Sequence, residues 1–196
     1  DIEKFFHIFL GRPDLDCQAE FIEARTLYEQ GDLEAAFYAW HSAFGDHRKA
    51  LKTLMRHDGD IHKTFRKMDG RLLSLLVCAW QSDVFNRVLE QRLDRMDTLL
   101  EGDMAYKHVN GACFRVEDAA AEQPRCEAFE ISPTGPLPGK RMTELTGPAG
   151  AIENAILHRL DLTPEDLTRL KRYGATGGRR PLRYQPQQAC LLYTSP

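Results

Sequence analysis

Residues 71–100, RLLSLLVCAWQSDVFNRVLEQRLDRMDTLL, decide how the rest of the chain is organised. Apolar side chains recur here at the period of an α-helix that buries part of its surface. They form a main stripe and a neighbouring one: Leu73, Leu76, Val77, Trp80, Val84 and Val88, then Phe85, Leu89 and Leu93. Because this surface is wider than a surface helix needs, we predict a long, largely buried central helix. Asn86 should be exposed or hydrogen-bonded, since burying an unpaired amide costs free energy.

The chain before this helix has the pattern of several shorter helices. Apolar residues within 19–31 recur at helical spacing, and Gly31 is a natural stop. Asp32 is suited to cap the next helix, which apolar spacing carries to Gly45. A further helix is predicted over residues 46–57. The first hundred residues are therefore expected to be helical.

Beyond Gly102 the pattern changes to short strand-like runs. Two of these runs flank Asn110-Gly111, which is the strongest short signal of a β-hairpin. The alternating residues 126–132 predict another strand. The Pro- and Gly-rich residues 133–142 that follow predict a loop.

Two helices and a final strand complete the prediction. The first helix covers residues 147–162, and TPED (163–166) supplies a cap, a first-turn proline and an acidic third position for a short helix through Leu170. RRPLRYQP (179–186) reads as a strand that is exposed or at an edge because of Pro181.

The predicted fold class is α+β: a helix-rich domain with a long central helix and a small, mostly antiparallel β-sheet in its C-terminal half. One domain is expected over residues 1–189, helical over 1–101 and mixed over 102–189. The last seven residues, CLLYTSP (190–196), resemble a translated sequencing adapter and are expected to be non-native or disordered.

Composition excludes several classes of protein. The formal net charge of −3 argues against coating nucleic acid by bulk charge, although a local basic face stays compatible with it. No apolar run approaches the roughly 18 residues of a membrane span, and the N-terminus has no secretory signal pattern. The cysteines are scattered without a C-x-x-C pair, which favours a reducing cytoplasm: Cys17, Cys78, Cys113, Cys126 and Cys190.

Metal and nucleotide sites find little support in the sequence. RHDGDIH (56–62) contains two histidines and two aspartates, but their spacing fits no common metal site, and Gly59 favours a turn between helices capped by the aspartates. GPLPGKRM (135–142) lacks the spacing and the hydroxyl of a phosphate-binding loop. We expect no metal and no cofactor.

Basic residues of the C-terminal half are candidates for contact with RNA. Such residues usually form a solvated face, but here they coincide with the Pro/Gly segment and an arginine pair that opens a strand, an arrangement that can bind phosphates. The candidates are Lys140, Arg141, Arg172, Arg179, Arg180 and Arg183.

Four stretches taken together resemble the tRNA pseudouridine synthase D (TruD) family. They are AWQSDVFNRVLEQRL (79–93), GDMAYKHVNGACFRVEDAAAEQPR (102–125), FEISPTGPLPGKRM (129–142) and GGRRPLR (177–183), in the family's order and approximate spacing. The resemblance covers residues 24–188. It implies cofactor-free isomerisation of uridine to pseudouridine in RNA, with tRNA as partner, and a mixed α/β catalytic domain with an inserted helix-rich domain. This chain looks like that insertion.

The sequence also departs from the family pattern. The family's catalytic aspartate follows a lysine in G-x-K-D, and this sequence has no Lys-Asp dipeptide. The N-x-x-G-x-Q-R-F-G segment and the later segment with an aromatic residue of the uridine pocket are missing too. No catalytic residue is therefore assigned, and we expect an inactive fragment of the enzyme, its own N-terminal end lying upstream.

A protein-interaction module is the alternative. LYEQGDLEAAFYAWHSAF (27–44) resembles one tetratricopeptide-type helical pair. The pattern occurs once, and the hairpin after Asp103 has no place in a solenoid.

Overall fold

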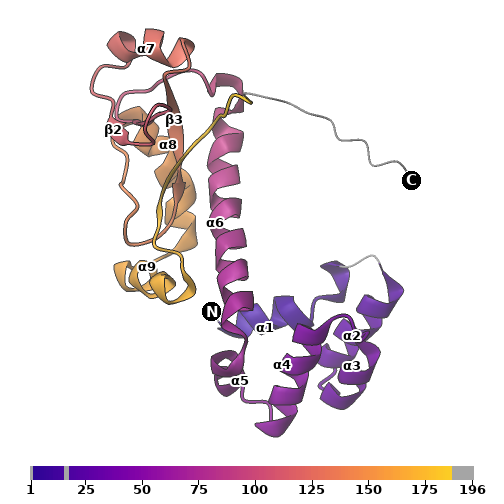
Figure 1. Ribbon diagram of the computed structural model, residues 1–196. Coiled ribbons are helices and arrows are strands. Elements are labelled where there is room, and N and C mark those ends of the chain that lie inside the picture. The colour runs from indigo at the N-terminus through magenta and orange to yellow at the C-terminus, as the bar shows by residue number, and fades with distance from the viewer. Residues whose placement is uncertain (1, 16–17, 187–196) are drawn as a thin grey trace. The chain divides into compact units, whose positions relative to one another are not determined.

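A computed structural model describes residues 2–15 and 18–186, which group into two compact units, residues 1–73 and 74–196 (Figure 1). The expected adapter-like tail, Cys190–Pro196, lies outside the described residues, as do Cys17 and the end of the expected domain, 187–189.

The first unit is helical. Its α-helices are α1 (Ile2–Leu10), α2 (Ala19–Glu29), α3 (Leu33–Ala39), α4 (Gly45–Arg56) and α5 (Ile61–Lys67), with a short 3-10 helix at Pro13–Leu15. Gly31 ends the α2 region with φ +83°, and Asp32 caps α3 by accepting a hydrogen bond from the Ala35 N–H, as predicted. Asp60 caps α5 in the same way through the Lys63 N–H, which confirms RHDGDIH as a capped turn.

Aromatic rings fill the core of this unit. Trp40 is 2% exposed and stacks on Phe21 and on His47, with ring centroids 5.6 Å and 4.3 Å away. The predicted extension of α3 to Gly45 is wrong, because the helix ends at Ala39 and Gly45 begins α4. Trp40 has an extended backbone, and the Arg48 guanidinium donates a hydrogen bond to its carbonyl at 2.7 Å. The carbonyl therefore keeps a partner although the helix has ended.

Helix α6 (Gly70–Arg92) is the long helix of the prediction, but it is shorter and less buried than expected. It ends eight residues before Leu100 and is followed by a 3-10 turn at Leu93–Arg95. Val84, Phe85 and Val88 are buried along with Leu73, whereas Leu75 is 66% exposed and Trp80 is half-buried. Asn86 is exposed, one of its two predicted states.

The second unit contains a four-stranded antiparallel sheet of order β2-β1-β3-β4. Its elements after α6 are β1 (Met104–Lys107), β2 (Cys113–Arg115), α7 (Ala119–Glu127), β3 (Ile131–Leu137), α8 (Gly147–Leu157), α9 (Pro164–Arg169) and β4 (Gly178–Pro181), with 3-10 turns at His158–Leu160 and Leu170–Tyr173. The hairpin around Asn110-Gly111 and the capping box of Thr163 with Asp166 are confirmed. So is the edge position of the last strand, β4.

The Pro- and Gly-rich segment differs from the prediction. Residues 119–127 form α7, so the strand predicted from Cys126 begins only at Ile131. It then continues through Pro133 and Pro136, where a loop was expected. Strand β3 pairs with β1 along Ile131–Pro133 and with β4 along Thr134–Leu137. Each part of the strand is therefore paired mainly on one side, which tolerates prolines because they have no N–H to donate.

Both faces of the sheet are covered. Side chains alternate between faces along a strand, so neighbouring residues of β1 enter different cores. Ala105 packs with Ile131 and with Cys126 of α7, while Met104 packs with Leu145 and with Ala149 of α8. The helix-rich α+β class with a small antiparallel sheet is therefore confirmed.

Candidate nucleic-acid interface

Four of the six predicted RNA-contacting residues are exposed: Lys140, Arg141, Arg172 and Arg180. The segments that carry them are joined by backbone contacts. A Cβ at Gly139 would lie 2.5 Å from the backbone N of Gly177, and the Arg141 N–H donates to the Thr176 carbonyl at 2.9 Å. The loop after β3 therefore lies directly against the segment that leads into β4.

Two of the sequence motifs meet at Arg180. Its guanidinium lies 5.3 Å from the ring centroid of Phe85, which belongs to the SDVFN part of α6. The same ring packs on Gly135 of β3, where a Cβ would come within 2.8 Å of the ring. Gly135 thus lets the helix approach the strand closely, and Phe85 in turn supports Arg180 at the surface.

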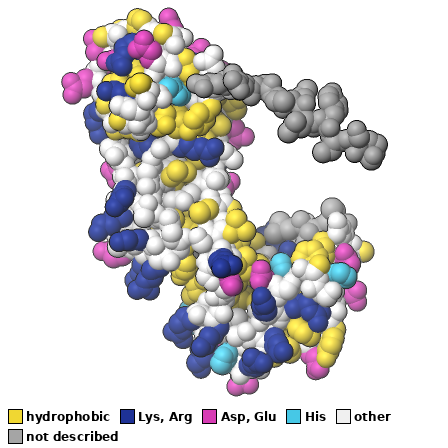
Figure 2. All heavy atoms as spheres, viewed as in Figure 1, with side chains coloured by type: hydrophobic (Ala, Val, Ile, Leu, Met, Phe, Trp, Pro, Cys, Tyr) yellow, Lys and Arg dark blue, Asp and Glu magenta, His cyan; other side chains and the backbone are white. Residues whose placement is uncertain are grey.

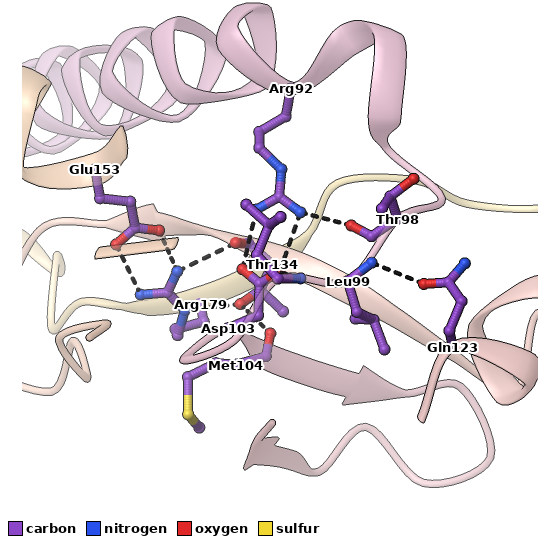
Figure 3. Close-up of polar contacts among 10 residues, drawn as sticks. Arg92, Thr98, Leu99, Asp103, Met104, Gln123, Thr134, Glu153 and Arg179 are labelled. Carbon is purple, nitrogen blue, oxygen red and sulfur yellow. Dashed lines mark hydrogen bonds and ion pairs between the residues drawn. The ribbon is translucent and has the colours of Figure 1, made fainter. Parts of the chain in front are cut away.

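Arg179 faces the interior instead. Its side chain is 4% exposed and pairs with Glu153 of α8, which is 3% exposed. The Nε–H donates to the Thr134 hydroxyl at 2.7 Å, and the terminal nitrogens donate to the Thr134 carbonyl and to both carboxylate oxygens of Glu153 (Figure 3). One of them also donates to the Thr143 carbonyl, at 2.7 Å. All five N–H groups are occupied, so Arg179 holds β4, β3 and α8 together.

A second buried ion pair was not anticipated from the sequence. Arg92, the last residue of α6, binds both oxygens of Asp103 at 3.0 Å, with side chains 3% and 0% exposed (Figure 3). Arg92 also donates to the Thr98 carbonyl, and Asp103 accepts the Leu100 N–H. The pair therefore ties the end of α6 to the turn that leads into β1. No local pattern distinguishes these charges from exposed ones.

The pKa of Glu153 reflects its burial and its pairing with Arg179. Burial raises the pKa of its carboxyl, and the hydrogen bonds and charge of Arg179 lower it, leaving a net shift upward. The negative charge of Asp103 adds to the rise, while Arg92 opposes it. Arg179 therefore offsets part of the cost of burying this carboxylate.

Arg183, the sixth predicted residue, is half-buried near the end of the sheet. Its Nε–H donates to the Ser132 hydroxyl at 3.0 Å, and Nη2 donates to the Cys126 carbonyl. The guanidinium also lies 4.5 Å from the Phe129 ring centroid. Unlike Arg179, it is only partly engaged by the protein.

The first unit carries a basic surface that the sequence interpretation missed. Residues 48–71 contain eight Lys or Arg and three Asp or Glu, and Lys49, Lys52 and Arg56 of α4 are exposed together with Lys63, Arg66 and Lys67 of α5. Figure 2 shows Lys and Arg side chains gathered on this part of the chain. Their density along the sequence was the available signal.

Other kinds of site are not seen in the part of the chain that the structure describes. Within residues 2–15 and 18–186, no group of three or more His, Cys, Asp or Glu side chains is arranged to hold a metal ion. None of the helices described there is long and apolar enough to cross a membrane.

Comparisons with known proteins all point to one family. The model of the family described as tRNA pseudouridine synthase D (TruD) matches residues 1–194. Proteins named tRNA pseudouridine synthase D are 40% identical in Syntrophotalea carbinolica, over 89% of this chain and 44% of the relative, and 43% identical in Geobacter sulfurreducens, over 83% and 41%. The corresponding Thermus thermophilus protein is 34% identical over 91% of this chain and 47% of its own.

A solved structure has the same fold. It is assigned to tRNA pseudouridine synthase D (TruD) from Methanosarcina mazei and superimposes with a TM-score of 0.78 at 22% identity, over 92% of this chain and 45% of that one. The chain thus spans about half the length, or slightly less, of the relatives that it matches.

Proposed function

The chain belongs to the tRNA pseudouridine synthase D family, and we propose that it is part of an enzyme that isomerises uridine to pseudouridine in tRNA. The family match along nearly the whole chain carries this proposal. The contact of the SDVFN helix with the SPTGP strand through Phe85 and Gly135 supports it, because two of the quoted stretches meet in one packed unit. The tetratricopeptide alternative has no comparable support.

We further propose that residues 1–189 correspond to the inserted domain of the family and bind RNA without performing the reaction alone. This second part rests on the missing Lys-Asp dipeptide. A cytoplasmic location and the absence of a metal or cofactor remain predictions of the same proposal.

The proposed contacts to RNA phosphates are the exposed Lys140, Arg141, Arg172 and Arg180, with Arg183 as a partly buried fifth. Arg179 acts as a positioning residue, because its N–H groups are all used inside the protein. Exposed cations on joined segments suit a phosphate backbone, which is recognised by charge and not by base identity.

The test of activity uses the purified chain and unmodified tRNA, with pseudouridine measured by mass spectrometry of the digested RNA. We expect no conversion by the chain and binding that weakens with salt. Conversion of uridine by the chain would contradict the proposal of an inactive part.

Neutralising substitutions test the contacts. Arg141→Gln and Arg180→Gln should each weaken tRNA binding and reduce the slope of log affinity against log salt by about 1. Arg87→Gln is the matched control, since Arg87 is an exposed α6 cation already paired with Asp83 at 2.8 Å. If the salt slopes of Arg141→Gln and Arg180→Gln equal those of Arg87→Gln and of the unaltered chain, these two arginines do not contact the RNA.

A further inference from the structure

Five side chains from three separate segments converge at one end of the sheet. We call them the Tyr184 cluster: Tyr106, His108, Phe129, Arg183 and Tyr184. His108 stacks on Phe129 with ring centroids 4.7 Å apart, and Tyr106 and Tyr184 meet His108 edge-on at 5.3 Å and 6.3 Å. Tyr184 is 60% exposed, so most of its ring faces solvent while one edge is held by protein.

Arg183 is fixed in this cluster with one end free. Nε and Nη2 are anchored to Ser132 and Cys126, and the guanidinium plane is supported by the Phe129 ring. Among the described residues, Nη1 has no hydrogen-bond partner. An arginine held in this way presents two N–H groups to an incoming acceptor with little loss of side-chain entropy.

His108 is tied to Arg183 through a shared partner. The Arg183 Nε–H donates to the Ser132 hydroxyl, and the same oxygen forms a hydrogen bond with His108 Nε2 at 2.8 Å. Burial and then the Arg183 charge lower the pKa of His108, so the imidazolium form is disfavoured beside the guanidinium. The cluster therefore combines aromatic rings with one arginine cation.

The backbone at Phe129 is also unusual. Its φ is +60°, two residues after the last residue of α7, at a position where glycine is the usual choice because a Cβ crowds the left-handed conformation. A bulky aromatic residue is retained there, with its ring under both His108 and Arg183. The packing of the cluster thus compensates for an unfavourable backbone conformation.

We propose that the Tyr184 cluster binds one unpaired nucleotide of an RNA strand, with its base stacked on the exposed Tyr184 ring and its phosphate accepting hydrogen bonds from Arg183 Nη1. Aromatic rings stack on bases of any sequence, and an anchored arginine matches a phosphate. Glu130, the exposed carboxylate that follows Phe129, forms an ion pair with Arg125 at 3.3 Å. The inference rests on the proposed function, which supplies RNA as the ligand.

The experiment measures binding of the whole chain to a single-stranded RNA oligomer that contains 2-aminopurine. Tyr184→Ala should weaken binding by about 5- to 150-fold, the range for loss of one stacked base, without changing the salt slope. Tyr184→Phe keeps the ring and should bind like the unaltered chain. Tyr38→Ala is the matched control, because Tyr38 is a 71% exposed tyrosine on α3 of the other unit. Stacking should also quench 2-aminopurine fluorescence, and Tyr184→Ala should abolish the quenching.

The outcomes separate this inference from the proposed function. RNA binding that is equal in the unaltered chain, Tyr184→Ala and Tyr38→Ala would overturn the cluster alone and leave the basic contacts standing. No binding of RNA by the unaltered chain would overturn both. Uridine monophosphate that competes as well as the strand would overturn the assignment to RNA in favour of a free nucleotide. Far-UV circular dichroism of each variant confirms that the chain is folded.

Discussion

Replacement of Arg179 by Met should make the stability of the second unit depend on pH in a defined direction. The substitution keeps an unbranched apolar stem, shorter than that of arginine, and removes the charge that Glu153 faces. Glu153 remains 2% exposed, with Asp103 still raising its pKa and only Arg92 opposing that rise. Removing one partner of a buried ion pair costs about 3–5 kcal/mol.

The sign follows from the protonation of Glu153. Without Arg179, the folded-state pKa of this carboxyl should lie further above its unfolded value of about 4.3. The penalty is therefore absent below the unfolded pKa, grows as pH rises toward the folded pKa and is complete above it. At low pH only lost hydrogen bonds to Thr134 and Thr143 should remain, at about 1–2 kcal/mol.

Urea unfolding at pH 5 and pH 8 measures the effect, with Trp80 fluorescence as the signal. A Trp40→Phe background ensures that this fluorescence comes from the second unit. Arg179→Met should lose more stability at pH 8 than at pH 5. Glu153→Gln should lose a similar amount at both, since a guanidinium stays charged throughout. Arg169→Met is the control, because its pair with Asp166 is exposed and should leave the midpoint unchanged. A loss in Arg179→Met that is equal at both pH values would contradict the predicted link between Arg179 and the protonation of Glu153.

Two further predictions concern the loop after β3 and the Tyr184 cluster. Gly139→Ala should destabilise the second unit by about 1–3 kcal/mol in urea unfolding, because its Cβ would meet the Gly177 backbone, whereas Gly178→Ala, with nothing within 4 Å, should have little effect. The His108 ring should titrate by NMR with a midpoint below about 6.5, so its stabilising contribution is complete above that pH and lost as pH falls through the lowered pKa. Arg183→Gln should raise that midpoint; an unchanged value would show that the arginine charge is not felt.

Local signals in the sequence predicted much of the fold. Asn110-Gly111 specifies a hairpin, and Asp32 and Thr163 specify helix starts, because each acts on backbone groups within a few residues. The failures involve distant partners. The end of α3 depends on Arg48 reaching back to the Trp40 carbonyl, and β3 depends on two neighbouring strands that share its length. A propensity for loops at Pro133 and Pro136 could not show that those neighbours divide the pairing.

The candidate site shows the same limit, but one part of it was within reach of the sequence. Arg179 and Arg180 were both expected to contact RNA, and the same interpretation placed them in one strand. Successive residues of a strand point to opposite faces, so that strand already implied different environments for the two arginines. Which one turns inward is decided by Glu153, a carboxylate on a helix about 26 positions earlier in the chain that is buried only because α8 covers the sheet. A buried arginine needs such a partner, and a solvent-facing one does not. The alternation therefore predicts that only one of Arg179 and Arg180 contacts RNA. Which of the two it is could be decided only from the folded structure.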